Sequence, residues 1–128
     1  MKQHLPASII INNYNYGRFL KEAIDSALNQ TYKHLEVIVV DDGSTDDSRE
    51  IVASYGTRVR PVFKSNGGQA SAFNVGLRAS AGKVVLFLDS DDVLLPMALE
   101  AAIPYFADPE VVKVHWSLLE IDEGGALK

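Results

Sequence analysis

Residues 35–43 have the sequence LEVIVVDDG, in which an almost unbroken apolar run is followed by two aspartates and a glycine. A strand with apolar residues at successive positions has both of its faces covered, which is typical of a parallel sheet between helices. The glycine would let a ligand approach the backbone closely. The stretch therefore predicts a buried strand that runs directly into a polar loop.

The rest of the chain alternates between strand patterns and helix patterns. The predicted strands are residues 7–11, 35–40, 59–63, 83–88 and 111–119. The predicted helices are residues 20–28, 51–55, 69–80 and 96–103. In the third helix, Ala70, Phe73 and Leu77 share one face. This order predicts an α/β fold, a mostly parallel open sheet of Rossmann-like type with helices on both faces.

Length and composition indicate one globular domain. The chain has 128 residues, of which 47% are apolar and 23% charged, values typical of soluble proteins. No apolar run reaches the roughly 18–20 residues of a membrane span, and the start lacks the apolar core of a signal peptide. The absence of cysteine rules out disulfides and thiolate metal sites and fits a reducing compartment. We therefore expect a cytoplasmic location.

The formal net charge of −5 argues against a nucleic-acid partner, which would select a basic surface. The distribution of the acids is more informative than their sum, because they cluster within residues 41–50 and 89–92. Carboxylates this close repel one another unless water, a helix N-terminus or a cation offsets their charge.

Three predicted strands run into polar loops, at residues 12–17, 41–46 and 89–92. In open α/β sheets, ligands bind beyond the carboxyl ends of the strands. Because the strands are expected to be parallel, all three loops should open at the same edge of the sheet. The sequence therefore predicts one binding site at this edge.

The acids after the second strand have two interpretations. Residues 44–46 could provide the N-cap of the next helix, with Asp47 and Glu50 as a capping box. That interpretation does not account for Asp41 and Asp42, which precede the cap. A carboxylate at their position could instead accept a hydrogen bond from the imide N–H of a uracil ring. The sequence leaves both interpretations open.

The loop after the fourth strand holds Asp89, Asp91 and Asp92. Hard carboxylate oxygens of this kind suit Mg²⁺ or Mn²⁺, which proteins bind with one or two side chains plus substrate phosphates. A calcium-binding EF-hand is excluded, because Val93 and Leu94 occupy positions that require an oxygen ligand and a glycine. A solvated turn is the structural alternative.

Two further features carry less information. Asn66 and the two glycines that follow it precede a predicted helix, where backbone N–H groups could bind an anion or simply form a turn. The histidines share no spacing typical of a metal site, and we expect them to be structural or on the surface. They are His4, His34 and His115.

Taken together, these motifs resemble glycosyltransferase family 2. The resemblance covers residues 8–106 in order and spacing. The segments that carry it are residues 8–15, 23–31, 36–46, 66–77 and 82–92. It implies a GT-A fold and an inverting, metal-dependent transfer from a nucleotide-sugar, commonly a UDP-sugar, to a hydroxyl of a carbohydrate or lipid-linked acceptor.

The resemblance also implies roles for individual residues. Asn12 and Tyr14 would lie along the base and ribose, and Asp42 would meet the uracil with Asp41 beside it. Asp89 would face the ribose or the metal shell. The implied metal ligand is Asp91, supported by Asp92, and the metal would be Mn²⁺ or Mg²⁺. The substrate-binding residues predicted in this way are Asn12, Tyr14, Asp41, Asp42, Asn66 and Asp89.

The sequence departs from the family in two respects. Phe73 stands where the family often has an arginine. Family members also continue into an acceptor-binding part that carries the catalytic acid, so residues 1–128 are expected to be a truncated, single GT-A nucleotide-sugar-binding domain. We therefore predict no catalytic residue within the chain and donor binding without efficient transfer. The truncated sheet edge suggests a homo-oligomer, and the full-length protein could associate with the inner face of the membrane.

Two other classes of protein stay open as alternatives. One is a non-catalytic nucleotide-binding module with the same fold. The other is a receiver domain of phospho-relay signalling, which needs acids after its first strand and a lysine after its fifth. Here the acids follow the second and fourth strands, and Lys113 lies inside a predicted strand.

Overall fold

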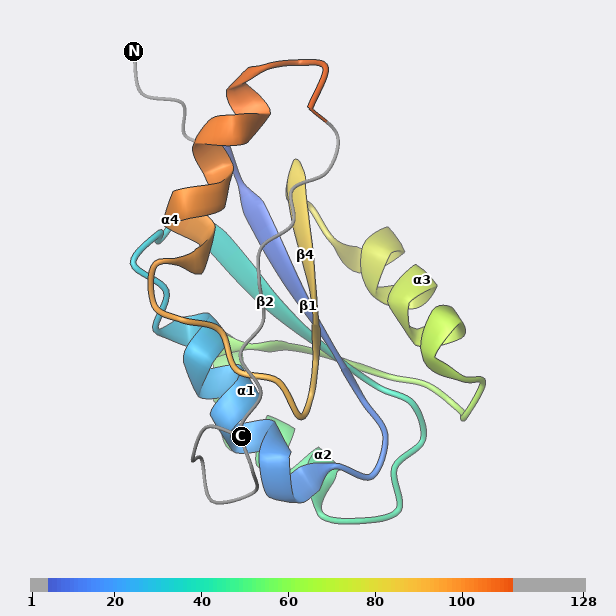
Figure 1. Cartoon of the computed structure of the whole chain (residues 1–128). Coiled ribbons are helices and arrows are strands. Elements are labelled where there is room, and N and C mark those ends of the chain that lie inside the picture. Colours follow the sequence, from blue (N-terminus) through green and yellow to red (C-terminus); the bar gives the residue numbers. More distant parts are fainter. Residues whose placement is uncertain (1–4, 112–128) are drawn as a thin grey trace, which may run out of the picture.

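A parallel sheet forms the centre of the protein in the computed structural model, which describes residues 5–111 (Figure 1). Its four strands are all parallel and lie in the order β3-β2-β1-β4. They are β1 (Ala7–Asn13), β2 (Leu35–Asp41), β3 (Arg60–Phe63) and β4 (Val84–Asp89). The predicted α/β class and parallel sheet are confirmed. The strand predicted over residues 111–119 falls almost wholly outside the described residues.

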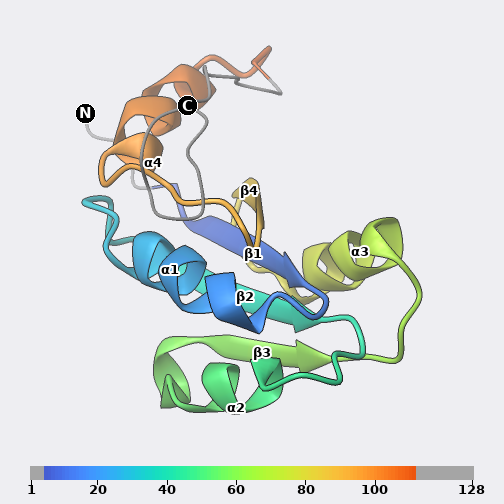
Figure 2. The same cartoon turned by 60° about the horizontal axis from the view of Figure 1, so that its bottom comes forward.

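Helices cover both faces of this sheet, as Figure 2 shows. The α-helices are α1 (Gly17–Leu28), α2 (Ser48–Ala53), α3 (Gln69–Ala79) and α4 (Ala98–Ala102). Two 3₁₀ helices, η1 (Gly56–Arg58) and η2 (Ile103–Ala107), complete the described elements. The fourth helix gives way to η2 at Ile103, next to Pro104, as expected from the helix-breaking effect of proline.

Strand β1 shows why its apolar run is continuous. Ile9 and Ile11 belong to the larger core with α1 and α2, whereas Ile10 belongs to a second core on the α3 face. All three side chains are fully buried. Burying one such side chain stabilises the fold by about 1.5–3 kcal/mol. The sheet is therefore held from both sides, as the sequence predicted.

The face of α3 that packs on the sheet differs from the expected one. Ala72 and Gly76 are the buried residues of this helix, whereas Leu77 is 47% exposed and Phe73 is partly buried against Phe87. A Cβ atom on Gly76 would lie 2.5 Å from a methyl group of Ile10. The helix thus approaches the sheet closely through its small residues, and a pattern of large apolar residues cannot show this.

The strand register brings the predicted polar loops to one edge of the sheet. Asn13 pairs with Asp41 across β1 and β2, and Asn12 pairs with Asp89 across β1 and β4. The carboxyl ends of three strands therefore meet there, as predicted. Within residues 5–111, no helix has the length and apolar character to cross a membrane.

Candidate functional site

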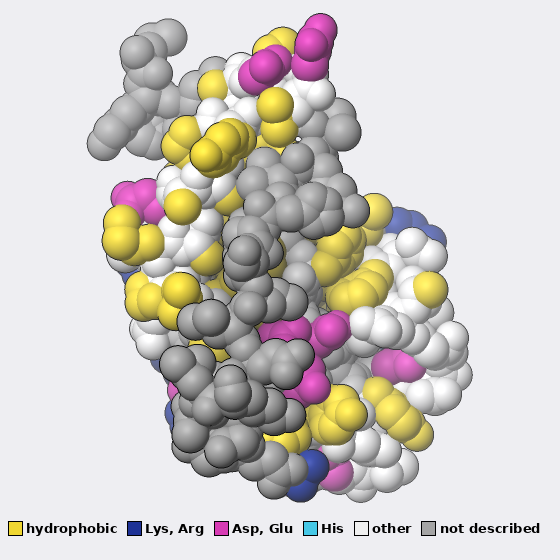
Figure 3. Space-filling view, viewed as in Figure 1, with side chains coloured by type: hydrophobic (Ala, Val, Ile, Leu, Met, Phe, Trp, Pro, Cys, Tyr) yellow, Lys and Arg dark blue, Asp and Glu magenta, His cyan; other side chains and the backbone are white. Residues whose placement is uncertain are grey.

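A hollow of about 440 Å³ opens at the carboxyl edge of the sheet. Acidic side chains gather in the middle of the same molecular face that Figure 1 presents, as Figure 3 shows. Six of the eight predicted site residues line the hollow. They are Asn12, Tyr14, Asp42, Asn66, Asp89 and Asp91. Asp41 and Asp92 are not among its lining residues.

Asp89, Asp91 and Asp92 form an acidic cluster at the rim of this hollow. Each offers a carboxylate oxygen, and these oxygens lie within 4.8 Å of one another. The cluster is tight because the backbone turns immediately after β4, where the Asp92 N–H donates to the carbonyl of Asp89 at 3.0 Å. Three carboxylates at this spacing fit a hard divalent cation such as Mg²⁺ or Mn²⁺.

The electrostatics of the cluster agree with this fit. Burial raises the pKa of Asp89, and the charge of Asp91 raises it further, although a 2.9 Å hydrogen bond from Gln69 partly opposes them. Partial burial raises the pKa of Asp92 most, and the charges of Asp91 and Asp89 raise it further. Repulsion from Asp91 is a cause that the two shifts share. A cation would relieve this repulsion.

Asp42 lies beside the hollow but is only 2% exposed. One of its oxygens accepts from the Lys64 ammonium at 2.6 Å and the Gly67 N–H at 3.0 Å. The other accepts from the Gly68 N–H at 2.9 Å and the Asn66 amide at 3.3 Å. Burial raises its pKa, but these donors outweigh burial and hold the pKa below its usual value. Asp42 therefore fixes the loop of residues 64–68 against the end of β2.

Gly43 permits this arrangement. Its φ of +84° is unfavourable for other residues, and a Cβ atom there would lie 2.8 Å from the backbone nitrogen of Asn66. The sequence suggested that this glycine admits a ligand to the backbone. In the structure it admits the neighbouring loop instead.

Asp41 is turned away from the hollow, because successive strand residues point to opposite faces. It is fully buried. Its carboxylate accepts from the Asn13 amide at 3.1 Å, the Ser44 N–H at 2.9 Å and the Arg49 guanidinium at 3.4 Å. These contacts secure the start of the loop toward α2. Asp41 and Asp42 therefore hold the two loops on opposite sides of β2.

The start of α2 differs from the predicted capping box. The helix begins at Ser48, and the side chain of Asp47 makes no capping hydrogen bond. Asp46 instead accepts from the N–H groups of Ser48 and Gly17, each at 2.9 Å. It thereby ties the loop after β1 to the loop after β2, and Asn15 adds a second tie by accepting from the Thr45 N–H at 2.7 Å.

The site includes residues that the sequence did not single out. Tyr16, Gln69 and Ser90 also line the hollow, beside Gly68 of the glycine pair that the sequence did indicate. Lys64 is the ion-pair partner of Asp42. A lysine three residues before a glycine pair gives no local signal of this role, because its partner lies 22 residues earlier in the chain.

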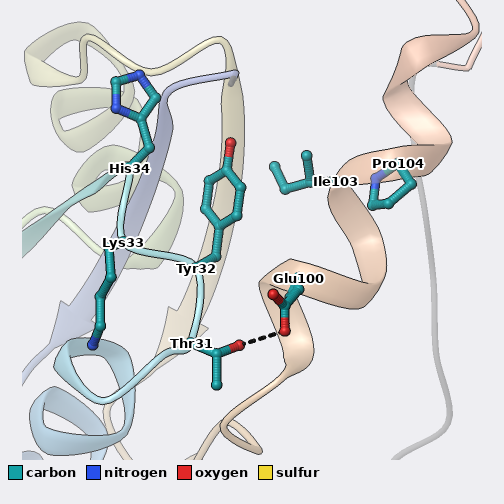
Figure 4. A pocket seen from close by; sticks show the side chains of 7 residues that line it. All are labelled: Thr31, Tyr32, Lys33, His34, Glu100, Ile103 and Pro104. Atoms are coloured by element: carbon teal, nitrogen blue, oxygen red, sulfur yellow. Dashed lines mark hydrogen bonds between the residues drawn. The ribbon is translucent and has the colours of Figure 1, made fainter. Parts of the chain in front are cut away.

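A second hollow, of about 560 Å³, lies away from the predicted loops (Figure 4). It is bordered by residues 31–34 on one side and by Glu100, Ile103 and Pro104 on the other. The Glu100 carboxylate accepts from the Thr31 hydroxyl at 2.9 Å. Although larger, this hollow has a single carboxylate that is already bonded, so the smaller one is the candidate site.

Comparison with known sequences agrees with the geometry of the site. The sequence model of the family described as Glycosyl transferase family 2 matches residues 8–124. An uncharacterized glycosyltransferase of Nostoc sp. is 44% identical over 119 residues, which cover 90% of this chain and 37% of the relative. The glycosyltransferase GlyG of Streptococcus pneumoniae is 39% identical over 97 residues, covering 73% of this chain and 32% of GlyG. The chain thus spans about a third of the length of these two relatives.

Solved structures agree as well. S. aureus TarS 1-349 in complex with UDP-GlcNAc has a TM-score of 0.74 and 32% identity, over 81% of this chain and 32% of TarS. The mannosyltransferase PcManGT from Pyrobaculum calidifontis, in complex with GDP-Man and Mn²⁺, has a TM-score of 0.74 and 28% identity, over 86% of this chain and 34% of PcManGT. The expected GT-A fold is confirmed, and the chain belongs to glycosyltransferase family 2.

Proposed function

We propose that the chain binds a nucleotide-sugar donor through a divalent metal, as the donor-binding part of an enzyme for inverting glycosyl transfer. One observation carries the proposal. The hollow at the carboxyl edge of the sheet combines Asp89 and Asp91 of the acidic cluster with Asn12 and Tyr14 from the loop after β1. An anionic diphosphate can lie near such acids only with a cation between them.

The metal site consists of Asp91 and Asp92 as ligands, with Asp89 beside them. Mn²⁺ and Mg²⁺ both suit three hard oxygens that can approach a common point. The presence of Mn²⁺ in the PcManGT complex supports this assignment. When bound, the metal acts as a Lewis acid on the leaving diphosphate.

The nucleoside would occupy the part of the hollow lined by Asn12, Tyr14 and Asn66. The side-chain oxygen of Asn12 is buried and has no hydrogen-bond partner among the described residues. It can therefore accept from a base or a ribose hydroxyl without breaking an existing bond. The ring of Tyr14 is 46% exposed beside it and offers an apolar surface to the nucleoside.

The predicted hydrogen bond from a uracil imide to Asp42 requires a change in the existing contacts of the carboxylate. Four donors already surround the carboxylate, so one of them must yield to the base. The Asn66 amide makes the longest of these bonds, at 3.3 Å, and Asn66 itself lines the hollow. We propose that Asn66 yields its place and that Asp41 supports the base site indirectly through the loop after β2.

The remaining parts of the reaction stay predictions. The general base and the site for a carbohydrate or lipid-linked acceptor are expected outside residues 1–128, so the chain should bind donor without efficient transfer. A cytoplasmic location, membrane association of the full-length protein and a homo-oligomer formed through the sheet edge also remain predictions. A receiver domain is wrong as an alternative, because the chain belongs to glycosyltransferase family 2.

Calorimetric titration of UDP into the chain, with Mn²⁺ and separately with EDTA, tests the proposed function. We expect binding with Mn²⁺ and a large loss of affinity with EDTA. Equal affinity under both conditions would disprove the metal-dependent site. Binding without sugar transfer in the full-length protein would favour a non-catalytic nucleotide-binding module.

A further inference from the structure

Gln30 is a polar residue that is 0% exposed, directly after the C-terminal end of α1. A buried amide is stable only when its hydrogen-bonding groups are satisfied, so its partners indicate what it holds in place. Those partners lie mainly in the segment that follows the acidic cluster. We infer that Gln30 is a positioning residue that fixes the acidic cluster by clamping this segment onto α1.

The clamp consists of hydrogen bonds from both ends of the Gln30 amide. Its nitrogen donates to the carbonyl of Leu95 at 2.8 Å and to the carbonyl of Ser26 at 3.1 Å. Its oxygen accepts from the N–H of Leu99 at 3.0 Å. One side chain thus bonds the backbone on both sides of the turn that begins α4.

Two neighbours of Gln30 extend the clamp. The Ser26 hydroxyl accepts from the N–H of Leu94 at 3.1 Å, and the Thr31 N–H donates to the carbonyl of Pro96 at 2.9 Å. Three consecutive residues of the segment, 94–96, are therefore bonded to the end of α1 and the residues that follow it. These contacts join parts of the chain more than 60 residues apart.

Within residues 5–111, few contacts other than this clamp hold the segment. Residues 92–95 belong to no helix or strand. Leu94 and Leu99 are buried in the larger core, but Val93, Leu95 and Met97 are exposed. Apolar burial therefore holds the segment at two points, and hydrogen bonds from α1 determine its path between them.

The clamp acts on one side of the acidic cluster only. Asp89 is held by its place in β4, by pairing with Asn12 and by the hydrogen bond from Gln69. Asp92 has no side-chain bond among the described residues and lies two residues before Leu94. The distance between the two carboxylates is therefore set by β4 at one end, by the turn hydrogen bond between Asp92 and Asp89, and by the Gln30 clamp beyond Asp92.

The amide group suits this role better than its near-isosteres. Glutamate at position 30 would place a carboxylate oxygen against the carbonyl of Leu95, where the amide now donates. Methionine would fill a similar volume but would leave the Leu95 carbonyl and the Leu99 N–H without partners. Either change should release the segment while leaving the acids themselves intact.

The inference rests on the proposed metal site, and Mn²⁺ titration of the wild-type chain and of Gln30→Met tests it. Replacing a residue that hydrogen-bonds directly to a metal ligand typically lowers metal affinity by about 10- to 100-fold. Gln30 bonds the backbone beyond the acidic cluster instead of a ligand, so we expect a loss near the lower end of this range for Gln30→Met. The matched control is Val52→Ala, which removes volume from the same core at α2. It should lower stability without changing Mn²⁺ affinity.

A second readout needs no metal. Amide hydrogen exchange of the metal-free chain should accelerate at Leu94 and Leu99 in Gln30→Met, with little change in β1 and β2. If Gln30→Met fails to fold, Ser26→Ala removes the acceptor of the Leu94 N–H, together with a bond to the Ala23 carbonyl within α1, and should give the same local effect in weaker form.

The outcomes are distinguishable. If wild type does not bind Mn²⁺, the proposed metal site is wrong, and hydrogen exchange still decides whether the clamp exists. If wild type binds Mn²⁺ and Gln30→Met binds it equally well, Gln30 does not position the acids. The inference is also overturned if Val52→Ala loses as much Mn²⁺ affinity as Gln30→Met, or if exchange at Leu94 is unchanged.

Discussion

Replacing Lys64 by methionine tests how the loop of residues 64–68 is held beside the hollow. The Lys64 and Asp42 side chains are 15% and 3% exposed, and their charged atoms lie 2.6 Å apart. Removing one partner of a buried ion pair typically costs about 3–5 kcal/mol, because the other charge is left without compensation. Asp42 keeps three other donors, so we expect a loss near the lower end, about 3 kcal/mol.

The pH dependence of this loss gives a sharper test. The folded-state pKa of Asp42 lies below the unfolded value of 3.8, so its pairing stabilises the fold at neutral pH and is lost as pH falls through the lowered pKa. Without Lys64, burial should raise that pKa, so that the variant carries a neutral Asp42 in mildly acidic solution. The stability difference between wild type and Lys64→Met should therefore be largest near pH 7 and shrink as pH approaches 3.8.

Urea denaturation of both proteins across this pH range measures the effect. Lys83→Met is a suitable control, because Lys83 is exposed and forms no ion pair among the described residues. Its loss should change stability by no more than about 0.5 kcal/mol. The reasoning would be refuted if Lys64→Met cost no more than Lys83→Met, or if its cost were the same at every pH.

Three further predictions concern the acids at the carboxyl edge of the sheet. Asp42→Ala should weaken UDP binding by about 10- to 100-fold, the loss of one charge-assisted hydrogen bond. Asp46→Ala should mainly lower stability, by about 1 kcal/mol, because the N–H groups of Ser48 and Gly17 lose their acceptor. Calorimetry and urea denaturation would separate the two, and equal effects on UDP affinity would contradict the assignment. Asp92→Asn should raise the melting temperature of the metal-free chain at pH 7. A carboxyl group with a raised folded-state pKa stabilises the fold at low pH and loses that contribution as pH rises through the window above 3.8. Asparagine has no proton to lose there and avoids this loss. Mn²⁺ affinity of the wild type should fall as pH is lowered toward 3.8, since protons compete for the carboxylate oxygens of Asp89 and Asp92, whose pKa values are raised above it. An affinity that does not fall over this range would contradict the metal assignment.

Local sequence patterns predicted the strands and the edge at which the site lies. The apolar run before Asp41 and the run before Asp89 each placed a strand correctly, and the parallel order then brought their polar ends together. Period-two alternation could also have shown that Asp41 and Asp42 point to opposite sides of β2. These features depend only on neighbouring residues and on the rules of parallel sheets.

The remaining features depend on contacts between distant parts of the chain. The loop that reaches Asp42 through Lys64, and the amide of Gln30 that reaches Leu95, have no local signal because their partners lie 22 and 65 residues away. The predicted buried face of α3 was wrong for a related reason. A side chain at position 76 would clash with the methyl groups of Ile10 and Val40 on the sheet, and the apolar periodicity of the helix does not reveal this.

The most direct test of the central claim is a calorimetric titration of UDP in the presence of Mn²⁺, with wild type, Asp91→Ala and Glu22→Ala compared. Glu22 is an exposed acid of α1 that does not line the hollow, so its loss controls for net charge. We expect Asp91→Ala to remove most of the Mn²⁺-dependent affinity while its melting temperature stays at or above that of wild type, because the repulsion among the three acids is relieved, whereas Glu22→Ala should bind UDP as wild type does. Mn²⁺-dependent binding that survives in Asp91→Ala would contradict it.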